Sequence, residues 1–215
     1  MKPMTQLEMD KLVAKYFEKD GYAFPSHFEH RYDDHSSAQC YSLIRKYKPT
    51  SCLEFGTSRG GSTRFIIAAL LKNKADFKFV GSEMEEELLN ETKKNVSDIA
   101  DKRVKLVSRI EDNLKHVPKE LDFVFIDTNH DLDNTRWYIE NIFPRIKTGS
   151  LVAIHDWAVK EEKGELIGKG HEGVGGWAET DYLMDLIRAG DFPLEKLYWN
   201  YEEGGNREAS FWIKK

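Results

Sequence analysis

The chain has 215 residues, a formal net charge of −5 and two cysteines. This length suits one domain with a hydrophobic core that needs no disulfide or structural metal. The acidic balance argues against a protein that binds a nucleic-acid backbone, so we expect a small-molecule partner. Cys40 and Cys52 have no metal or redox spacing and indicate reduced, buried thiols. No apolar run is long enough for a signal peptide or a membrane span, which predicts a cytoplasmic protein.

Hydrophobic periodicity and turn residues predict the order of the elements. Two helices open the chain, at residues 5–20 and 37–47, and they end at Gly21 and before Pro49. Strands and helices then alternate as far as residue 154. The expected strands are 51–55, 77–81, 104–107, 121–126 and 151–154, with helices at 62–71, 86–99 and 132–146. Such alternation is typical of a parallel, doubly wound sheet.

The pattern changes after the fifth strand. We expect a charged, glycine-containing loop at 160–176, a helix at 178–189, and two final strands at 194–201 and 209–214. The link between these strands, 202–206, is rich in turn residues and indicates an antiparallel hairpin. The sequence therefore predicts an α/β fold: a Rossmann-like, doubly wound sheet of seven mostly parallel strands that ends in a C-terminal antiparallel β-hairpin.

The segment around the end of the first strand reads LEFGTSRGGST over residues 53–63. Gly56 and Gly60 allow a tight turn and a close approach of the backbone to a ligand. The spacing matches neither the dinucleotide pattern GxGxxG nor a phosphate-binding P-loop, which disfavours NAD and ATP. The Glu54 carboxylate would repel a pyrophosphate, but it suits a ligand with an ammonium group, such as S-adenosylmethionine (SAM). The alternative is a turn that binds no ligand.

Ligands of open α/β sheets bind beyond the carboxyl ends of the strands, so the residues at these ends are informative. Glu83 follows the second strand, with Met84 beside it, and its carboxylate can accept both hydroxyls of a ribose. A solvated acid at a strand end is the alternative interpretation. Ile110 follows the third strand and is expected to cover one face of an adenine ring.

Two further carboxylates follow adjacent strands, Asp127 after the fourth and Asp156 after the fifth. Their convergence, with an imidazole nearby, suits Mg²⁺ or Mn²⁺, and a bound ion could hold a substrate oxygen and lower its pKa. His130 is a candidate general base, because an imidazole titrates nearest neutrality. Two alternatives stay open: Asp127 caps the next helix or contacts the cofactor, and Asp156 accepts hydrogen bonds from loop amides.

These residues together resemble the class I SAM-dependent methyltransferases. The most similar branch is methyltransferase family 24, the small-molecule enzymes akin to macrocin and cephalosporin-type O-methyltransferases. The resemblance covers residues 52–157 and rests on three segments in the right order. They are the turn LEFGTSRGGST, the segment FIDTNH at 125–130, and the stretch from KTGS to HD at 147–156. It implies a seven-stranded sheet with a reversed last hairpin, which agrees with the strand count.

The resemblance also implies roles for individual residues. The expected cofactor contacts are Glu54, Gly56, Thr57, Ser58, Gly60, Ser62, Glu83, Met84, Ile110 and Asp127. In metal-using members the ion is held by acids that match Asp127 and Asp156, and the base matches His130. This chain departs from some of those members, because His155 stands where they carry a further acid and Trp157 where they carry asparagine.

We therefore expect a SAM-dependent methyltransferase that methylates a hydroxyl group of a small molecule. Residues 1–50 are expected to form a helical cap and 51–215 the methyltransferase domain, with a homo-oligomer as an option. Segments 22–36 and 160–177, which hold several histidines and aromatic residues, are expected to complete the substrate site. A non-catalytic SAM or nucleoside sensor is the alternative, although it would have no use for Asp127, His130 and Asp156. A nicotinamide-dependent oxidoreductase is disfavoured by the glycine spacing.

Overall fold

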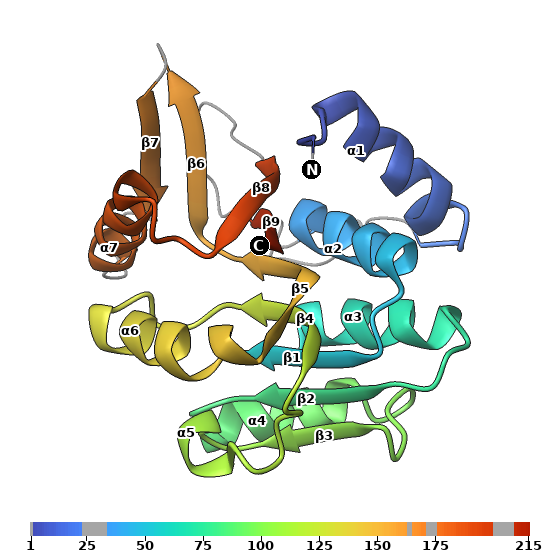
Figure 1. The fold of residues 1–215 in the computed structure, drawn as a ribbon. Helices are drawn as coiled ribbons and strands as arrows, with labels where there is room; N and C mark the ends of the chain where they lie inside the picture. Colours follow the sequence, from blue (N-terminus) through green and yellow to red (C-terminus); the bar gives the residue numbers. More distant parts are fainter. Residues whose placement is uncertain (1, 23–33, 163–164, 171–175, 200–208) are drawn as a thin grey trace.

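A twisted sheet forms the centre of the molecule, and helices cover both of its faces (Figure 1). The computed structural model describes residues 2–22, 34–162, 165–170, 176–199 and 209–215. The strands are β1 (Ser51–Phe55), β2 (Lys78–Ser82), β3 (Val104–Val107), β4 (Leu121–Ile126), β5 (Ile146–Ile154), β6 (Trp157–Glu162), β7 (Glu165–Gly170), β8 (Leu194–Trp199) and β9 (Ser210–Lys214). The helices are α1 (Gln6–Val13), α2 (Asp34–Tyr47), α3 (Gly61–Lys72), α4 (Glu86–Asn95), α5 (Ile110–Asn113), α6 (Leu132–Asn141) and α7 (Gly176–Ala189), with a π-helical turn η1 (Ala14–Glu18) and a 3-10 turn η2 (Phe143–Arg145).

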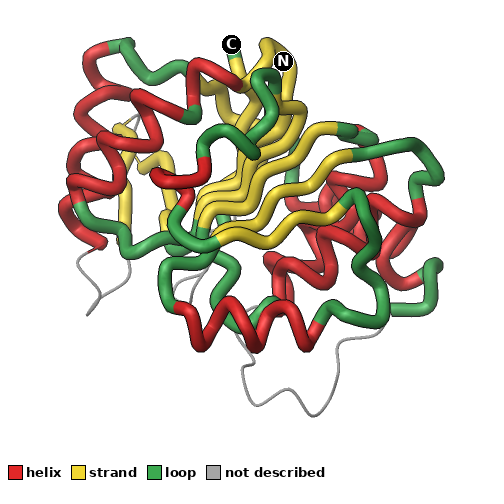
Figure 2. Tube along the Cα trace, turned by 90° about the horizontal axis from the view of Figure 1, so that it is seen from below, coloured by secondary structure: helices red, strands yellow, loops and turns green. Residues whose placement is uncertain are grey.

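The main sheet has seven strands in the order β3-β2-β1-β4-β5-β9-β8. Strands β1 to β5 pair in parallel, whereas β9 lies antiparallel between β5 and β8. In Figure 2 these strands lie side by side as one twisted layer between helices. The predicted fold class is confirmed. The strand order reverses between β1 and β4, so residues that follow these two strands meet where ligands of such sheets bind.

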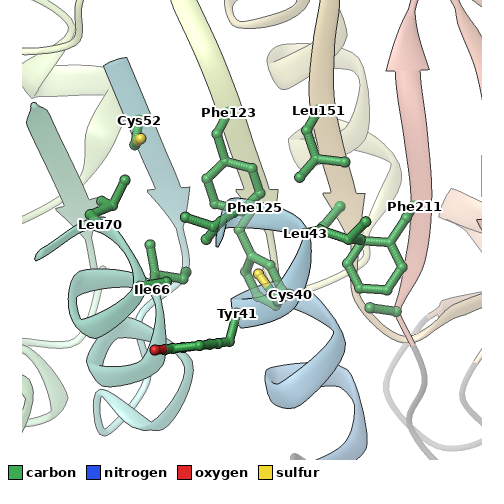
Figure 3. Packing of buried hydrophobic residues seen from close by; sticks show 14 of the residues in the cluster. Cys40, Tyr41, Leu43, Cys52, Ile66, Leu70, Phe123, Phe125, Leu151 and Phe211 are labelled. Carbon is green, nitrogen blue, oxygen red and sulfur yellow. The ribbon is translucent and has the colours of Figure 1, made fainter. Parts of the chain in front are cut away.

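Helices bury both faces of the sheet. Successive side chains of a strand point to opposite sides, so each strand contributes to the core on both faces. Cys52 and Phe123 face α2 and α3 on one side (Figure 3). Leu53 and Val124 lie in the cluster on the other side, which also holds residues of α6 and α7. Met9 of α1 belongs to the first cluster, so the N-terminal helices share the core of the sheet. Both cysteines are free and buried, as expected.

The structure corrects the expectation of a loop at 160–176. Residues Trp157–Glu162 and Glu165–Gly170 form strands β6 and β7, which pair antiparallel in a separate two-stranded sheet. Val159, Leu166 and Ile167 are residues that favour strands, but the surrounding charges hid this pattern in the sequence. The segment therefore contributes an ordered arm beside α7 (Figure 1).

Several helices also differ from the prediction, and the helix expected at 86–99 ends at Asn95. The helix expected at 132–146 ends at Asn141, because Pro144 cannot continue it, and β5 begins at Ile146. The short helix α5, after β3, was not predicted. The first helix changes to π geometry at Ala14–Glu18 instead of running uniformly to residue 20.

Several expectations concern residues outside those described. They are the histidines at 27, 30 and 171, and the link at 202–206 between the last two strands. The side chains of His35 and Trp177 are likewise not described. Among the described residues, the structure contains no helix with the length and apolar character needed to cross a bilayer.

Candidate active site

The turn between β1 and α3 is shaped by its contacts with two neighbouring elements. Gly56 has a φ of +93°, and a Cβ added there would lie 1.7 Å from the carbonyl oxygen of Asp127. Gly60 has a φ of +85°, and its Cβ would lie 3.1 Å from Cγ2 of Thr92 in α4. Both conformations favour glycine. The fold of the turn itself therefore requires these glycines, in agreement with the tight turn that the sequence predicted, and their contacts with Asp127 and Thr92 add a reason that the sequence did not show.

Glu83, at the end of β2, holds the tip of this turn. Its Oε2 accepts a hydrogen bond of 2.7 Å from the backbone N–H of Ser58, and its Oε1 accepts one of 3.1 Å from Glu85. Ser58 has a positive φ of 46°, which this bond helps to stabilise. The neighbouring side chain of Met84 is 50% exposed, which is unusual for a large apolar residue in this protein. Glu83 and Met84 thus border the Gly-rich turn from the second strand.

Glu54 is a buried carboxylate beneath the turn, with 0% of its surface exposed. Its Oε1 accepts a hydrogen bond of 2.5 Å from the hydroxyl of Ser62. Its Oε2 is buried and makes no hydrogen bond to any described residue. Burial raises the pKa of Glu54 to about 8, against the opposing effect of the Ser62 hydrogen bond, and the charge of Asp127 adds to the rise. The free oxygen of Glu54 is therefore suited to a cationic or hydrogen-bond-donating ligand.

Asp127 lies directly after β4, and its backbone N–H donates to the carbonyl of Phe55 at 2.8 Å. Its Oδ1 is 3.3 Å from Nδ1 of His155 and 3.8 Å from Nε2 of His130. Burial acts to raise the pKa of Asp127, but the charges of the two histidines outweigh it and hold this pKa well below its usual range. Asp127 does not cap the next helix. That role belongs to Asp131, which accepts a hydrogen bond of 2.8 Å from the N–H of Asn134.

Asp127, His130 and Asp156 converge as the sequence predicted. One donor atom from each lies within 4.8 Å of the other two. His130 Nε2 is 3.6 Å from Oδ2 of Asp156, a separation too long for a hydrogen bond. His130 and Asp156 both have a φ of +53°. Such a conformation costs about 1–2 kcal/mol in a non-glycine residue, and it turns both side chains toward Asp127.

The other ring nitrogen of His130 is held by Glu179, from the first turn of α7. Nδ1 of His130 lies 2.6 Å from Oε2 of Glu179, and the hydroxyl of Tyr138 donates to Oε1 of Glu179 at 2.7 Å. Burial opposes the effect, but the nearby carboxylate of Asp127 and the hydrogen bond to Glu179 raise the pKa of His130 to about 10. Sequence reasoning missed Glu179. A signal existed, because Glu179 shares a helix face with the buried Leu183 four residues later.

His155 faces the same cluster from β5. Its Nδ1 is 3.3 Å from Asp127 and 3.5 Å from Oδ1 of Asp156. Burial acts to lower the pKa of His155, but the nearby carboxylates of Asp127 and Asp156 raise it well above its usual value. In the absence of another cation, these raised pKa values favour the charged form of both histidines beside the carboxylates.

Ile110 does not present its side chain to a ligand. It is 0% exposed and packs in the hydrophobic cluster with Val107 and Val124. The next residue, Glu111, lines an open cleft together with Trp137 and the first turn of α6. This cleft, about 370 Å³ in volume, lies to the side of the Asp127 cluster and does not include it. An adenine contact at Ile110 stays a prediction, one that would rely on backbone atoms.

Comparison with known proteins supports a methyltransferase. A family model described as a methyltransferase domain matches residues 53–157. No curated protein matches the sequence significantly. The fold is similar to the O-methyltransferase TomG of Streptomyces achromogenes, involved in tomaymycin synthesis and solved with SAM, at a TM-score of 0.63 and 15% identity, covering 100% of this chain and 92% of that one.

Two further structures show the same fold. One is a methyltransferase of Podospora anserina bound to S-adenosylhomocysteine (SAH), with a TM-score of 0.63, 17% identity, and coverage of 100% of this chain and 98% of that one. The other is an O-methyltransferase of Bacillus cereus in complex with SAH, with a TM-score of 0.62, 14% identity, and coverage of 98% and 92%.

The seven-stranded sheet, the Gly-rich turn after β1 and the acids at the strand ends define a class I methyltransferase fold. The methyltransferase-domain model that matches residues 53–157 and the similar folds together confirm the resemblance to class I SAM-dependent methyltransferases.

Proposed function

We propose that the protein is an O-methyltransferase that moves the methyl group of SAM to a hydroxyl group of a small molecule. One observation carries this proposal: Asp127, His130 and Asp156 converge within 4.8 Å at the ligand-binding edge of a methyltransferase sheet. A protein that only senses SAM would gain nothing from this cluster, and its two left-handed residues would be a cost without a use. The known ligands of the similar structures are SAM and SAH, which supports SAM as the methyl donor.

SAM would lie across the Gly-rich turn. The unbonded Oε2 of Glu54 supports a contact with the amino group of the methionine part. The carboxylate of Glu83 supports a contact with the ribose, although it would have to share its oxygens with the backbone of Ser58. The exposed side chain of Met84 offers an apolar surface for the adenine ring. Thr57 to Ser62 supply the backbone of the turn.

The donor set of the cluster suits a divalent ion. Asp127 and Asp156 offer oxygen atoms, and the imidazole of His130, almost fully buried, points at them without forming a short hydrogen bond. We propose that Asp127 and Asp156 hold Mg²⁺ or Mn²⁺. The ion would bind the acceptor hydroxyl and stabilise the alkoxide that develops during transfer.

His130 acts as the general base at its Nε2 atom. The acceptor oxygen forms a bond to the methyl carbon while the bond from that carbon to the sulfonium sulfur breaks. The hydroxyl proton passes to Nε2, and the products are a methyl ether and SAH. The base must be neutral, and neutralisation of Asp127 and Asp156 by a cation favours that form of His130.

Within this function, we propose residues 1–50 as a helical cap and 51–215 as the methyltransferase domain. No nucleic acid or membrane is proposed as a partner, and assembly of copies stays a prediction.

Two measurements test the proposal. Calorimetry with SAM, SAH and NAD should give saturable binding of the first two and none of NAD. Mass spectrometry should then detect a product one methyl group heavier when the protein, SAM and Mg²⁺ are incubated with a panel of hydroxylated metabolites. Binding of NAD without binding of SAM would contradict the cofactor. SAM binding with no product over a broad panel would favour the sensor.

A further inference from the structure

We infer that Glu179 of α7 is a positioning residue for His130: it holds Nδ1 of the imidazole, so that Nε2 is the nitrogen that faces Asp127 and Asp156. The inference rests on the proposed function in one respect, the role of Nε2 as the general base. The contact between Glu179 and His130 does not depend on it.

Distances and burial support this role. Oε2 of Glu179 lies 2.6 Å from Nδ1, whereas the contacts of Nε2 with Asp127 and Asp156 are 3.8 and 3.6 Å. Glu179 already accepts a hydrogen bond from the hydroxyl of Tyr138, and we assign Nδ1 of His130 as the donor to its other oxygen. Glu179 is 1% exposed, and no solvent competes for its oxygen. In a neutral imidazole with a proton on Nδ1, Nε2 carries the lone pair.

The surroundings of Glu179 fix its own position. Its second oxygen accepts a hydrogen bond of 2.7 Å from the hydroxyl of Tyr138, which is fully buried in α6. The carboxylate therefore bridges two side chains, one from the loop before α6 and one from within α6. Since His130 has a left-handed backbone outside any helix or strand, secondary structure does not orient its ring. The bridge from α7 supplies that orientation.

This arrangement gives α7 a part in the site that its sequence position does not suggest. The helix follows the β6–β7 arm in the sequence, and Glu179 comes 49 residues after His130. When a histidine donates a hydrogen bond of this kind to a carboxylate and works through its other nitrogen, the bond fixes both the ring orientation and the site of the proton. We place Glu179 in that role, without contact with substrate or cofactor.

Nuclear magnetic resonance tests the contact without any methyl acceptor. The probe is the Nδ1 proton of His130 in ¹⁵N-labelled protein, assigned by its loss in His130→Gln. In the native protein this proton should be strongly deshielded and slow to exchange, because it is buried in a short bond to a carboxylate. Glu179→Leu should abolish the signal. Thr180→Val is the matched control, because Thr180 is the next buried residue of α7 and its hydroxyl bonds to no described residue.

A conservative variant keeps the test decisive if Glu179→Leu does not fold. In Glu179→Gln the amide oxygen can still accept from Nδ1, but a neutral acceptor forms a weaker bond, so the signal should remain at lower chemical shift. A signal unchanged in folded Glu179→Leu, or unchanged in Glu179→Gln, overturns the inference. If the signal behaves as expected but no acceptor is ever methylated, the positioning contact stands and the proposed function is what fails.

Discussion

The backbone carbonyl of Asp127 occupies the space where Gly56 would carry a side chain. The distance from that oxygen to a Cβ at Gly56 would be 1.7 Å, and the φ of Gly56 is +93°. The first residue after β1 and the first after β4 are thus in backbone contact at the point where the strand order reverses. This contact places the Gly-rich turn directly beside the carboxylate cluster.

Gly56→Ala should destabilise the protein by about 2–5 kcal/mol, because the new methyl group adds a backbone clash to a left-handed conformation. Urea denaturation measures the free energy of unfolding. Gly149→Ala is the matched control, since Gly149 has a φ of +83° but nothing within 4 Å of the Cβ position. It should cost only about 1–2 kcal/mol. Equal losses in both variants would mean that the contact with Asp127 has no effect.

SAM affinity should depend on the protonation of Glu54. Burial raises the pKa of this carboxyl to about 8 in the free protein, and a positively charged ligand at Oε2 would favour the ionised form. Binding then releases a proton below pH 8, so affinity should fall as pH falls, by up to about tenfold per pH unit. Calorimetry between pH 6 and pH 9 detects that proton when it is repeated in buffers of different ionisation enthalpy.

Glu54→Gln provides the control, because its affinity should be low and lack this pH dependence. The same substitution should stabilise the ligand-free protein above pH 8. The sign follows from the raised pKa, because the folded protein holds the Glu54 proton more tightly than the unfolded chain does. The protonated carboxyl therefore stabilises the native protein at low pH, and this contribution is lost as the pH rises from 4.5 to about 8. Thermal unfolding at high pH measures the gain. A native-like pH dependence of SAM binding in Glu54→Gln would assign the effect to another group.

Metal binding should depend on Asp127 and Asp156 but not on nearby acids outside the cluster. Mn²⁺ titrations followed by electron paramagnetic resonance should show one site in the native protein, and Asp156→Asn should weaken it. Asp133→Asn is the control, because Asp133 is exposed in the first turn of α6. EDTA should stop methyl transfer without releasing SAM. Full activity in excess EDTA would remove the ion from the mechanism and leave His130 as a base that needs no metal.

His130→Ala should lower kcat by about 10²–10⁴-fold, because proton removal by a positioned base is lost. Glu179→Leu should lower kcat by about 10–100-fold, with little change in the Kd of SAM. If Glu179 acts only through His130, it should have no further effect in the His130→Ala background. Steady-state rates with an acceptor from the mass-spectrometric panel complete this double-mutant cycle. Independent, multiplicative losses would indicate a separate role for Glu179.

The parallel part of the sheet was predictable because its strands are buried on both faces. Runs such as Leu121–Ile126 are apolar apart from Asp122, and a glycine or a charged segment ends each of them. The β6–β7 arm was not predictable on this basis, because charged residues interrupt the apolar ones in both of its strands. Pro144 gave a signal for the early end of α6 that the periodicity of the neighbouring residues outweighed.

The candidate site was predictable where it follows from topology. Asp127, His130 and Asp156 all come within a few residues of a strand end, and parallel strands bring such positions together. Glu179 required knowledge of how α7 packs, since no strand end or glycine marks it. The second function of the glycines at 56 and 60 also required coordinates, because contacts with Asp127 and Thr92 span distant parts of the sequence.

The position of β9 has a consequence for the order of folding during synthesis. This strand follows β8 in the sequence, yet it lies between β5 and β8 in the sheet and pairs with both. Until it leaves the ribosome, the edge of β5 has no partner on that side, and β8 has no sheet to join. An open edge of this kind invites pairing with other chains. The nascent protein is therefore most exposed to aggregation after β5 has emerged and before β9 has, because β9 is the strand that joins β8 to the rest of the sheet.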